Sequence, residues 1–230
     1  MAELMFYQQP IVLNRETNKD LCFTATSDYG FSKGVNSVPL TGIEFFEASR
    51  DLPVLFSKDE EGNYFPIVLL SLRGDGHEQI GAEGEWTGNY IPAFIRRYPF
   101  ALTEGKDLCY DSTAAGFSEE GDRLFDDEGK NTETLDSIIT FLTDFDAQHQ
   151  LTREFCSELS ELSMFKPFML QVMTVDKSAL RLDGLFIIDE DKLGDLDNEK
   201  VGAWFRKGFL AWIYAHMHSL GSLNRLSDKL

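Results

Sequence analysis

The pattern of apolar and polar positions predicts short elements in the first half of the chain and long helices in the second. From about Glu133 to Phe165, apolar side chains recur at i, i+3 and i+4, which is typical of a long helix with one buried face. The pattern is compatible with a break near Asp146 to Thr152. A last helix, from about Glu199 to Leu226, is apolar over a broad surface, so we expect it to pack on more than one side or to meet a partner.

Short apolar runs separated by turn residues predict antiparallel hairpins. The run Ile67–Leu70 is apolar on both faces, which is typical of a strand in the middle of a sheet. The hairpins are expected at 53–57 with 64–72, at 100–103 with 108–111, and at 170–175 with 179–188 around Asp176 and Lys177, with further short strands at 11–13 and 21–24.

Capping residues predict two short helices. A threonine-to-glutamate capping box at 41–44 predicts a helix over 42–49, with Ile43 and Phe46 facing inward. A serine followed by two glutamates predicts a second helix over 118–125. Together the elements indicate an α+β fold, in which antiparallel β hairpins or a sheet accompany a long helix and a packed C-terminal helix. We expect one domain over residues 1–230, with a possible subdivision near 112–131.

The stretch Asn89–Phe100 combines aromatic residues, two prolines and two adjacent arginines. It predicts a short helix that its first residue caps and that Pro99 ends, with Phe94, Ile95 and Tyr98 on one face.

The two arginines of this stretch are the most distinctive charges in a chain that is poor in cations. Because a guanidinium can hold a carboxylate through two parallel hydrogen bonds, we predict a ligand-binding site for a small anion at Arg96, Arg97, Tyr98 and Trp86. Two alternatives stay open: the arginines pair with acids of the same chain, or they bind an acidic segment of a partner.

The formal charge of −18 makes nucleic acid an improbable partner, because carboxylates repel phosphate. The first ten residues lack the basic start and apolar run of a signal peptide, and no window is apolar enough to span a membrane. The three cysteines are far apart and odd in number, which favours a reducing compartment. We therefore expect a soluble cytoplasmic protein.

No pattern in the chain indicates a catalytic residue, a metal site or a cofactor. His216 and His218 are two residues apart on a predicted helix, which places them on opposite faces. The acidic turn at 122–133 does not match a calcium-binding loop, and phosphate-binding glycine motifs and nucleophile elbows are absent. The broad apolar surface of the last helix instead predicts a protein interface at Trp204, Phe209, Trp212 and His216.

The chain resembles the SapC-related family of bacterial proteins, which is named for an association with a bacterial surface layer. The resemblance implies an accessory role at such a layer, and it supplies no catalytic residue. It rests on Phe6-Tyr7, Leu13-Asn14-Arg15, Asn36-Ser37-Val38-Pro39-Leu40, the stretch Tyr90–Phe100, Gly116-Phe117-Ser118, Leu124-Phe125-Asp126, Gly184-Leu185-Phe186, Ile213-Tyr214-Ala215-His216 and Ser219-Leu220.

The leading functional hypothesis is a non-catalytic interaction or accessory protein of a Gram-negative bacterium, which binds another protein or a second copy of itself. The alternatives are an enzyme or a binder of small anions with a pocket near Arg96 and Arg97, and a surface-layer-associated accessory protein.

Overall fold

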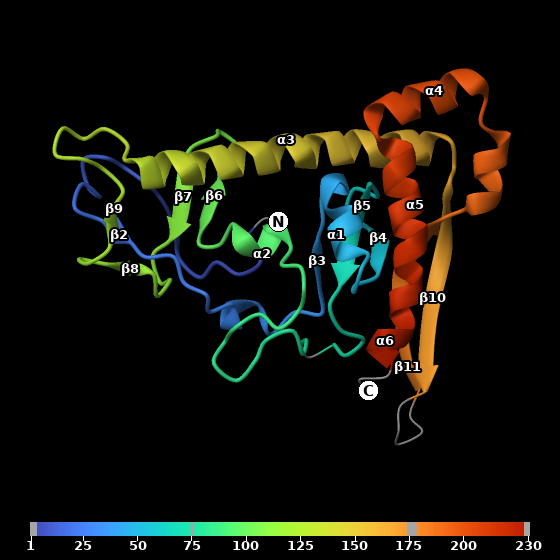
Figure 1. Cartoon of the computed structure of the whole chain (residues 1–230), viewed down its shortest axis with the longest axis horizontal. Helices are drawn as coiled ribbons and strands as arrows, with labels where there is room; N and C mark the ends of the chain where they lie inside the picture. The colour runs from blue at the N-terminus through green and yellow to red at the C-terminus, as the bar shows by residue number, and fades with distance from the viewer. Residues whose placement is uncertain (1–3, 75, 174–178, 228–230) are drawn as a thin grey trace.

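The computed structural model describes residues 4–74, 76–173 and 179–227. Three antiparallel sheets lie below one long helix, and a group of shorter helices covers one end of the molecule (Figure 1). The α-helices are α1 (Phe45–Ala48), α2 (Ala93–Arg96), α3 (Glu133–Glu161), α4 (Asn198–Lys207), α5 (Phe209–Ser219) and α6 (Leu223–Ser227). The 3-10 helices are η2 (Gly30–Ser32), η3 (Gly42–Glu44), η4 (Glu190–Asp195) and η5 (Leu220–Ser222).

The largest sheet has five strands in the order β10-β11-β4-β5-β3. A second sheet has the order β1-β7-β6, and a third has the order β8-β2-β9. The strands are β1 (Pro10–Val12), β2 (Cys22–Phe23), β3 (Ser37–Pro39), β4 (Val54–Lys58), β5 (Tyr64–Leu69), β6 (Phe100–Leu102), β7 (Leu108–Asp111), β8 (Phe117–Ser118), β9 (Asp122–Arg123), β10 (Phe165–Met173) and β11 (Ala179–Ile188). The mixed architecture confirms the predicted α+β class, and β5 lies between β4 and β3 as the apolar run in it predicted.

Helix α3 connects the two halves of the molecule. Its first half contributes Leu135 and Leu142 to a core that also contains the aromatic side chains of the two small sheets. Its second half contributes Phe155 and Leu159 to the main core, which the five-stranded sheet and α5 share. The helix is unbroken for 29 residues, so it is about 43 Å long. The break considered near 146–152 is absent from this helix.

The predicted end of α3 was a few residues too late. The helix ends at Glu161, and Ser163 then takes a left-handed conformation with φ of 53°. This turn lets the chain enter β10 at Phe165, five residues earlier than the strand that the sequence predicted. The predicted turn at Asp176 and Lys177 lies outside the described residues.

The predicted last helix over 199–226 is divided. Gly208 has φ of 80° and ends α4, and α5 starts directly after it. A residue without Cβ adopts this conformation at little cost, so it permits a sharp change of direction. As a result α4 lies across the end of α3, while α5 runs down the five-stranded sheet (Figure 1). A 3-10 turn, η5, then separates α5 from α6.

The predicted helix over 118–125 was wrong. Phe117–Ser118 and Asp122–Arg123 form β8 and β9, which pair with the two sides of β2. Gly121, with φ of 125°, places a non-helical turn between them. The interval 112–131, considered as a domain boundary, thus contains two strands of a sheet.

The helix predicted over 42–49 is present as η3 followed by α1, but its inward face was assigned wrongly. Phe45 and Ala48 are buried, whereas Ile43 is 59% exposed and Phe46 is 54% exposed. At the start of the segment the Gly42 N–H donates to the Thr152 hydroxyl of α3 at 2.8 Å, and α1 packs against α5, so tertiary contacts decide which face is buried.

Among the described residues, no helix is long and apolar enough to cross a membrane.

Candidate functional site

The arginine-containing stretch begins with a helix that is shorter than predicted. Only Ala93–Arg96 is helical, and Pro92 rather than Asn89 precedes its first residue. The Asn89 amide instead donates to the carboxylate of Asp51 at 2.5 Å. Phe94 and Ile95 are buried as predicted, whereas Tyr98, the third residue of the predicted face, follows the helix and is half-buried.

A buried carboxylate holds the start of α2. Glu44 Oε1 accepts the Ala93 N–H at 2.7 Å and the Tyr90 hydroxyl at 2.7 Å. Its other oxygen, Oε2, accepts the N–H and the hydroxyl of Thr41 at 2.9 and 2.8 Å. Burial, followed by the charge of Glu44, raises the pKa of Tyr90, so its hydroxyl stays a donor to this carboxylate. Glu44 thus completes the capping box of η3 and also binds the first turn of α2.

A second buried carboxylate lies where the N-terminal segment meets the sheet β1-β7-β6. Asp111 accepts the N–H groups of Gln8 and Gln9 at 2.9 and 3.1 Å and the hydroxyls of Thr113 and Tyr98 at 2.8 and 3.1 Å. Burial acts to raise the pKa of Asp111, but hydrogen bonds from Gln8, Thr113 and Gln9 outweigh it, and the net pKa is lowered. Asp111 is therefore an ionised structural group that fixes Tyr98.

The two adjacent arginines point to different surroundings. Arg96 is exposed; its Nε donates to the Ile91 carbonyl at 3.0 Å, and its guanidinium lies 6.0 Å from the Tyr90 ring and 5.4 Å from the Phe141 ring. Arg97 is buried, with its guanidinium 4.3 Å from the ring of Phe94. Successive residues of a helix project about 100° apart, so the pair does not form one fork.

Tyr98 and Trp86, the other two residues of the predicted ligand site, belong to a continuous series of rings. Tyr98 stacks on Phe31 with ring centroids 4.1 Å apart, Phe31 contacts Tyr29, and Tyr29 contacts Trp86 at 6.2 Å. Burial, with the neighbouring Asp111 charge, raises the pKa of Tyr98 to about 12. Trp86 Nε1 is a buried donor without a hydrogen-bond partner among the described residues. The structure thus connects these two aromatic side chains while separating Arg96 from Arg97.

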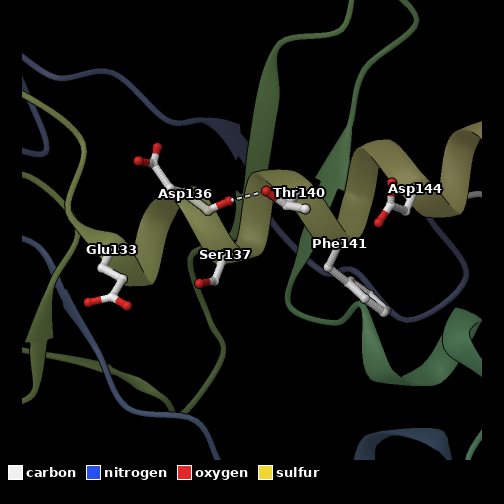
Figure 2. Close-up of a pocket in the computed structure, with 6 residues that line it drawn as sticks. All are labelled: Glu133, Asp136, Ser137, Thr140, Phe141 and Asp144. Atoms are coloured by element: carbon white, nitrogen blue, oxygen red, sulfur yellow. Dashed lines mark hydrogen bonds between the residues drawn. The ribbon is translucent and has the colours of Figure 1, made fainter.

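The pocket in Figure 2 lies elsewhere, along one face of the first half of α3. It is an open hollow of about 630 Å³. The Thr140 hydroxyl in its wall donates to the Asp136 carbonyl at 2.8 Å, and Phe141 connects one end of the pocket to Arg96. The lining residues are Glu133, Asp136, Ser137, Thr140, Phe141 and Asp144, and none belongs to the predicted ligand site.

This pocket presents negative charge. Its three carboxylates form no ion pair within the described part of the chain, although Asp136 accepts the Asn131 amide at 3.0 Å. The surface therefore suits cationic groups rather than anions. The spacing of its acids and hydroxyls at i, i+3 and i+4 was a sequence signal that could have identified this helix face.

The four side chains of the predicted interface, Trp204, Phe209, Trp212 and His216, are buried within the chain itself. Phe209 packs edge-on against Phe155 of α3, with ring centroids 5.1 Å apart. The Trp204 Nε1 donates to Glu158 Oε2 at 2.6 Å. In this conformation their surface is covered by α3, α1 and the five-stranded sheet, and a partner does not reach it.

His216 and His218 lie on opposite sides of α5, one buried and one exposed. His216 Nδ1 lies 2.8 Å from the Val54 carbonyl of β4, and its Nε2 accepts the Ile188 N–H of β11 at 3.2 Å. Burial lowers its pKa to about 4. Sequence reasoning identified His216 as a buried or interface residue, but it could not identify these two backbone partners, because they depend on tertiary packing.

Large apolar side chains do reach solvent on neighbouring helical segments. Phe205 on α4 is 76% exposed and Tyr214 on α5 is 60% exposed, in addition to Ile43 on η3 and Phe46 on α1. Helices α1 and α4 both pack against α5, so the helical segments that carry these side chains are neighbours (Figure 1). We call these four residues the exposed helical apolar set.

Comparison with known proteins gives a family match that agrees with the motifs described above. No curated protein and no solved structure matches the chain. The family model described as SapC matches residues 13–226, which is nearly the whole sequence, and the chain therefore belongs to the SapC family.

Proposed function

We propose that this chain is a non-catalytic interaction or accessory protein of a Gram-negative bacterium, which binds another protein through its helical end. The observation that carries the proposal is the exposed helical apolar set. Phe205 and Tyr214 are 76% and 60% exposed in a chain whose other large side chains mostly pack inside. Exposed apolar groups that gather on one region of a protein are typical of protein-binding sites.

The proposed binding surface differs from the one that the sequence predicted. The inner faces of α4 and α5 hold these helices against α3 through the buried side chains Trp204, Phe209 and Trp212. Phe205 and Tyr214 are presented outward by the same two helices. The expected broad apolar surface is thus divided between a packed inner face and an outer face for a partner.

A cytoplasmic location belongs to the same proposal. The three cysteines are free and buried, which supports a reducing compartment. A role next to a surface layer is a further hypothesis, supported only by the name of the family.

The test compares the full chain with the double variant Phe205→Ser/Tyr214→Ser, with Met169→Ser as the control, because Met169 is 56% exposed but lies on β10. Light scattering over a range of concentrations measures self-association, and cross-linking in cells measures binding to other proteins. We expect the double variant to lose the complexes that the control keeps. Complexes that persist unchanged in the double variant would contradict the proposed surface.

Arg96 supports a second candidate, the binding of a small anion. Its guanidinium is exposed and lies near the aromatic rings of Tyr90 and Phe141. These rings hold the guanidinium in place and leave its positive charge available to an anion. Citrate, titrated by calorimetry against the wild type and Arg96→Ala, tests this role. Heat of binding that the variant retains would exclude Arg96 as the anion-binding residue.

A further inference from the structure

The junction between β4 and β11 contains an imidazole where a backbone hydrogen bond is expected. Among the described residues, the two strands share a single backbone pair, Phe56 with Phe186, whereas β4 pairs with β5 along its whole length. Continuing the antiparallel register by two residues places Val54 opposite Ile188. At this position the ring of His216, from α5, lies between the strands and contacts the Val54 carbonyl and the Ile188 N–H.

The two backbone partners define the state of the ring. A carbonyl only accepts hydrogen bonds, so Nδ1 of His216 carries the proton that Val54 receives. An N–H only donates, so Nε2 accepts from Ile188 and carries no proton. Ser219, one turn further along α5, accepts the Val54 N–H at 2.9 Å. One helix therefore satisfies both backbone groups of Val54.

We propose that His216 is a pH-sensitive link between β4 and β11, and that its protonation separates the β10–β11 hairpin from β4 before the rest of the molecule unfolds. An added proton on Nε2 would place two N–H donors against each other at Ile188. The pair would repel, and a positive charge would lie in the main core. The opening would occur at this junction because, in the described part of the chain, Phe56 with Phe186 is the one backbone pair between the two strands.

No neighbouring element offers the protonated ring a counter-ion. Apart from Cys156, the charged and titratable groups of the surrounding elements have other partners or lie at the surface. The Cys156 thiol is buried, and burial raises its pKa, so it stays neutral. Lys58 of β4 lies over the Tyr64 ring, and Lys166 of β10 pairs with Asp189 after β11. The remaining groups are Glu47 and Arg50 at α1, Cys156, Glu154 and Glu158 on α3, Arg181 and Asp183 on β11, and His218 on α5. None of these side chains hydrogen-bonds the ring within the described residues.

The size of the effect follows from the two protonation states. Burial lowers the pKa of His216 to about 4 in the closed junction. A solvated histidine titrates near 6.5, so the open form gains protons at a higher pH than the closed form. Between pH 7.5 and pH 5.0 the ratio of open to closed junctions should rise about 30-fold.

Amide hydrogen exchange on the full chain, corrected for the intrinsic effect of pH, tests the proposal. We expect protection at Phe186 and Ile188, which face β4, to fall about 30-fold from pH 7.5 to pH 5.0, while Ile187, which faces β10, and the β4–β5 ladder keep their protection. The variants His216→Asn and His216→Gln, which do not titrate, should remove this pH dependence. If all strands lose protection together, or if the variants retain the full pH dependence, the proposal is overturned.

An NMR titration of the His216 ring in the wild type gives a test that does not depend on a variant. A pKa of the ring far below 6.5, together with faster hydrogen exchange of the Ile188 amide as the pH falls, supports the proposed role of His216. A ring that titrates near 6.5 while Ile188 keeps its protection overturns it.

Discussion

Glu44 and Ala93 are 49 residues apart in the sequence, and the Glu44 carboxylate accepts the Ala93 N–H at 2.7 Å. The same buried side chain accepts two hydrogen bonds from Thr41 and one from Tyr90. One carboxylate therefore positions two helices, η3 and α2. Because α2 ends at Arg96 and Arg97 follows it directly, the local capping motif at 41–44 also fixes the arginine stretch.

Replacing Glu44 by alanine should lower the free energy of unfolding by about 3 kcal/mol, because the buried donors of Thr41, Tyr90 and Ala93 would lose their acceptor. Urea unfolding followed by circular dichroism measures this change. Glu47→Ala is the matched control, since Glu47 is a surface residue that pairs with Arg50, and it should change stability by about 0.5 kcal/mol or less. Equal losses in both variants would contradict the proposed role of Glu44.

Gly42→Ala should destabilise the contact between η3 and α5. A Cβ at Gly42 would lie 2.2 Å from the Trp212 ring, and that ring is packed among Phe45, Phe155 and Phe209. Overpacking of this kind costs about 1–3 kcal/mol. The expected result is a lower midpoint of urea unfolding with altered tryptophan fluorescence. Gly34→Ala, where a Cβ would meet no atom within 4 Å, should leave both unchanged.

Local signals in the sequence predicted most element types, with the helix over 118–125 as the exception, but neighbours in space decided several details. The capping box at 41–44 was recognised, yet the packing of this segment on α3 and α5 leaves Ile43 and Phe46 exposed. The apolar pattern of the last helix was also recognised. It did not distinguish a face that packs in the core from a face that binds a partner, because an apolar side chain such as Trp212 is typical of both.

The candidate site was harder to predict than the fold. The adjacent arginines were identified as unusual charges, but consecutive helix positions diverge, so one is buried and the other is exposed. The predicted link between Trp86 and Tyr98 is present only through Tyr29 and Phe31, which lie more than fifty residues away in the sequence. Such contacts depend on tertiary packing, and a single sequence carries no local signal for them.

Arg97→Ala and Arg96→Ala should differ in their effect on stability. The Arg97 guanidinium is buried between the rings of Phe94 and Phe145, so its removal should cost about 2 kcal/mol through lost packing. Arg96 is exposed, and its removal should cost about 0.5 kcal/mol. Urea unfolding of the two variants measures the difference. A larger loss in Arg96→Ala than in Arg97→Ala would refute the structural assignment.

Glu158 should make the attachment of α4 to α3 sensitive to strong acid. Its carboxylate accepts hydrogen bonds from Trp204 at 2.6 Å, Lys200 at 3.1 Å and Lys207 at 2.7 Å. Burial acts to raise the pKa of Glu158, but hydrogen bonds from Lys207, Trp204 and Lys200 outweigh it and lower the pKa to about 2. The ionised carboxylate is therefore the form that the folded state prefers.

The direction of the pH dependence follows from this preference. A glutamate in the unfolded chain titrates near 4.3, so the stabilisation by Glu158 is complete above that pH and is lost as the pH falls toward about 2. Glu158→Gln should cost about 1 kcal/mol at pH 7, because charge-assisted bonds become neutral ones. The difference between wild type and variant should shrink from pH 4.5 to pH 3.

Urea unfolding at pH 7.0, 4.5 and 3.0, followed by tryptophan fluorescence, measures this difference. Glu161→Gln is the control, because Glu161 is exposed and accepts only a 3.4 Å bond from Ser157. His216 titrates over a higher range, between its pKa of about 4 and 6.5, and it is present in every protein compared, so its contribution cancels. A Glu158→Gln deficit that stays constant down to pH 3 would show that the α3–α4 contact does not depend on the charge of Glu158.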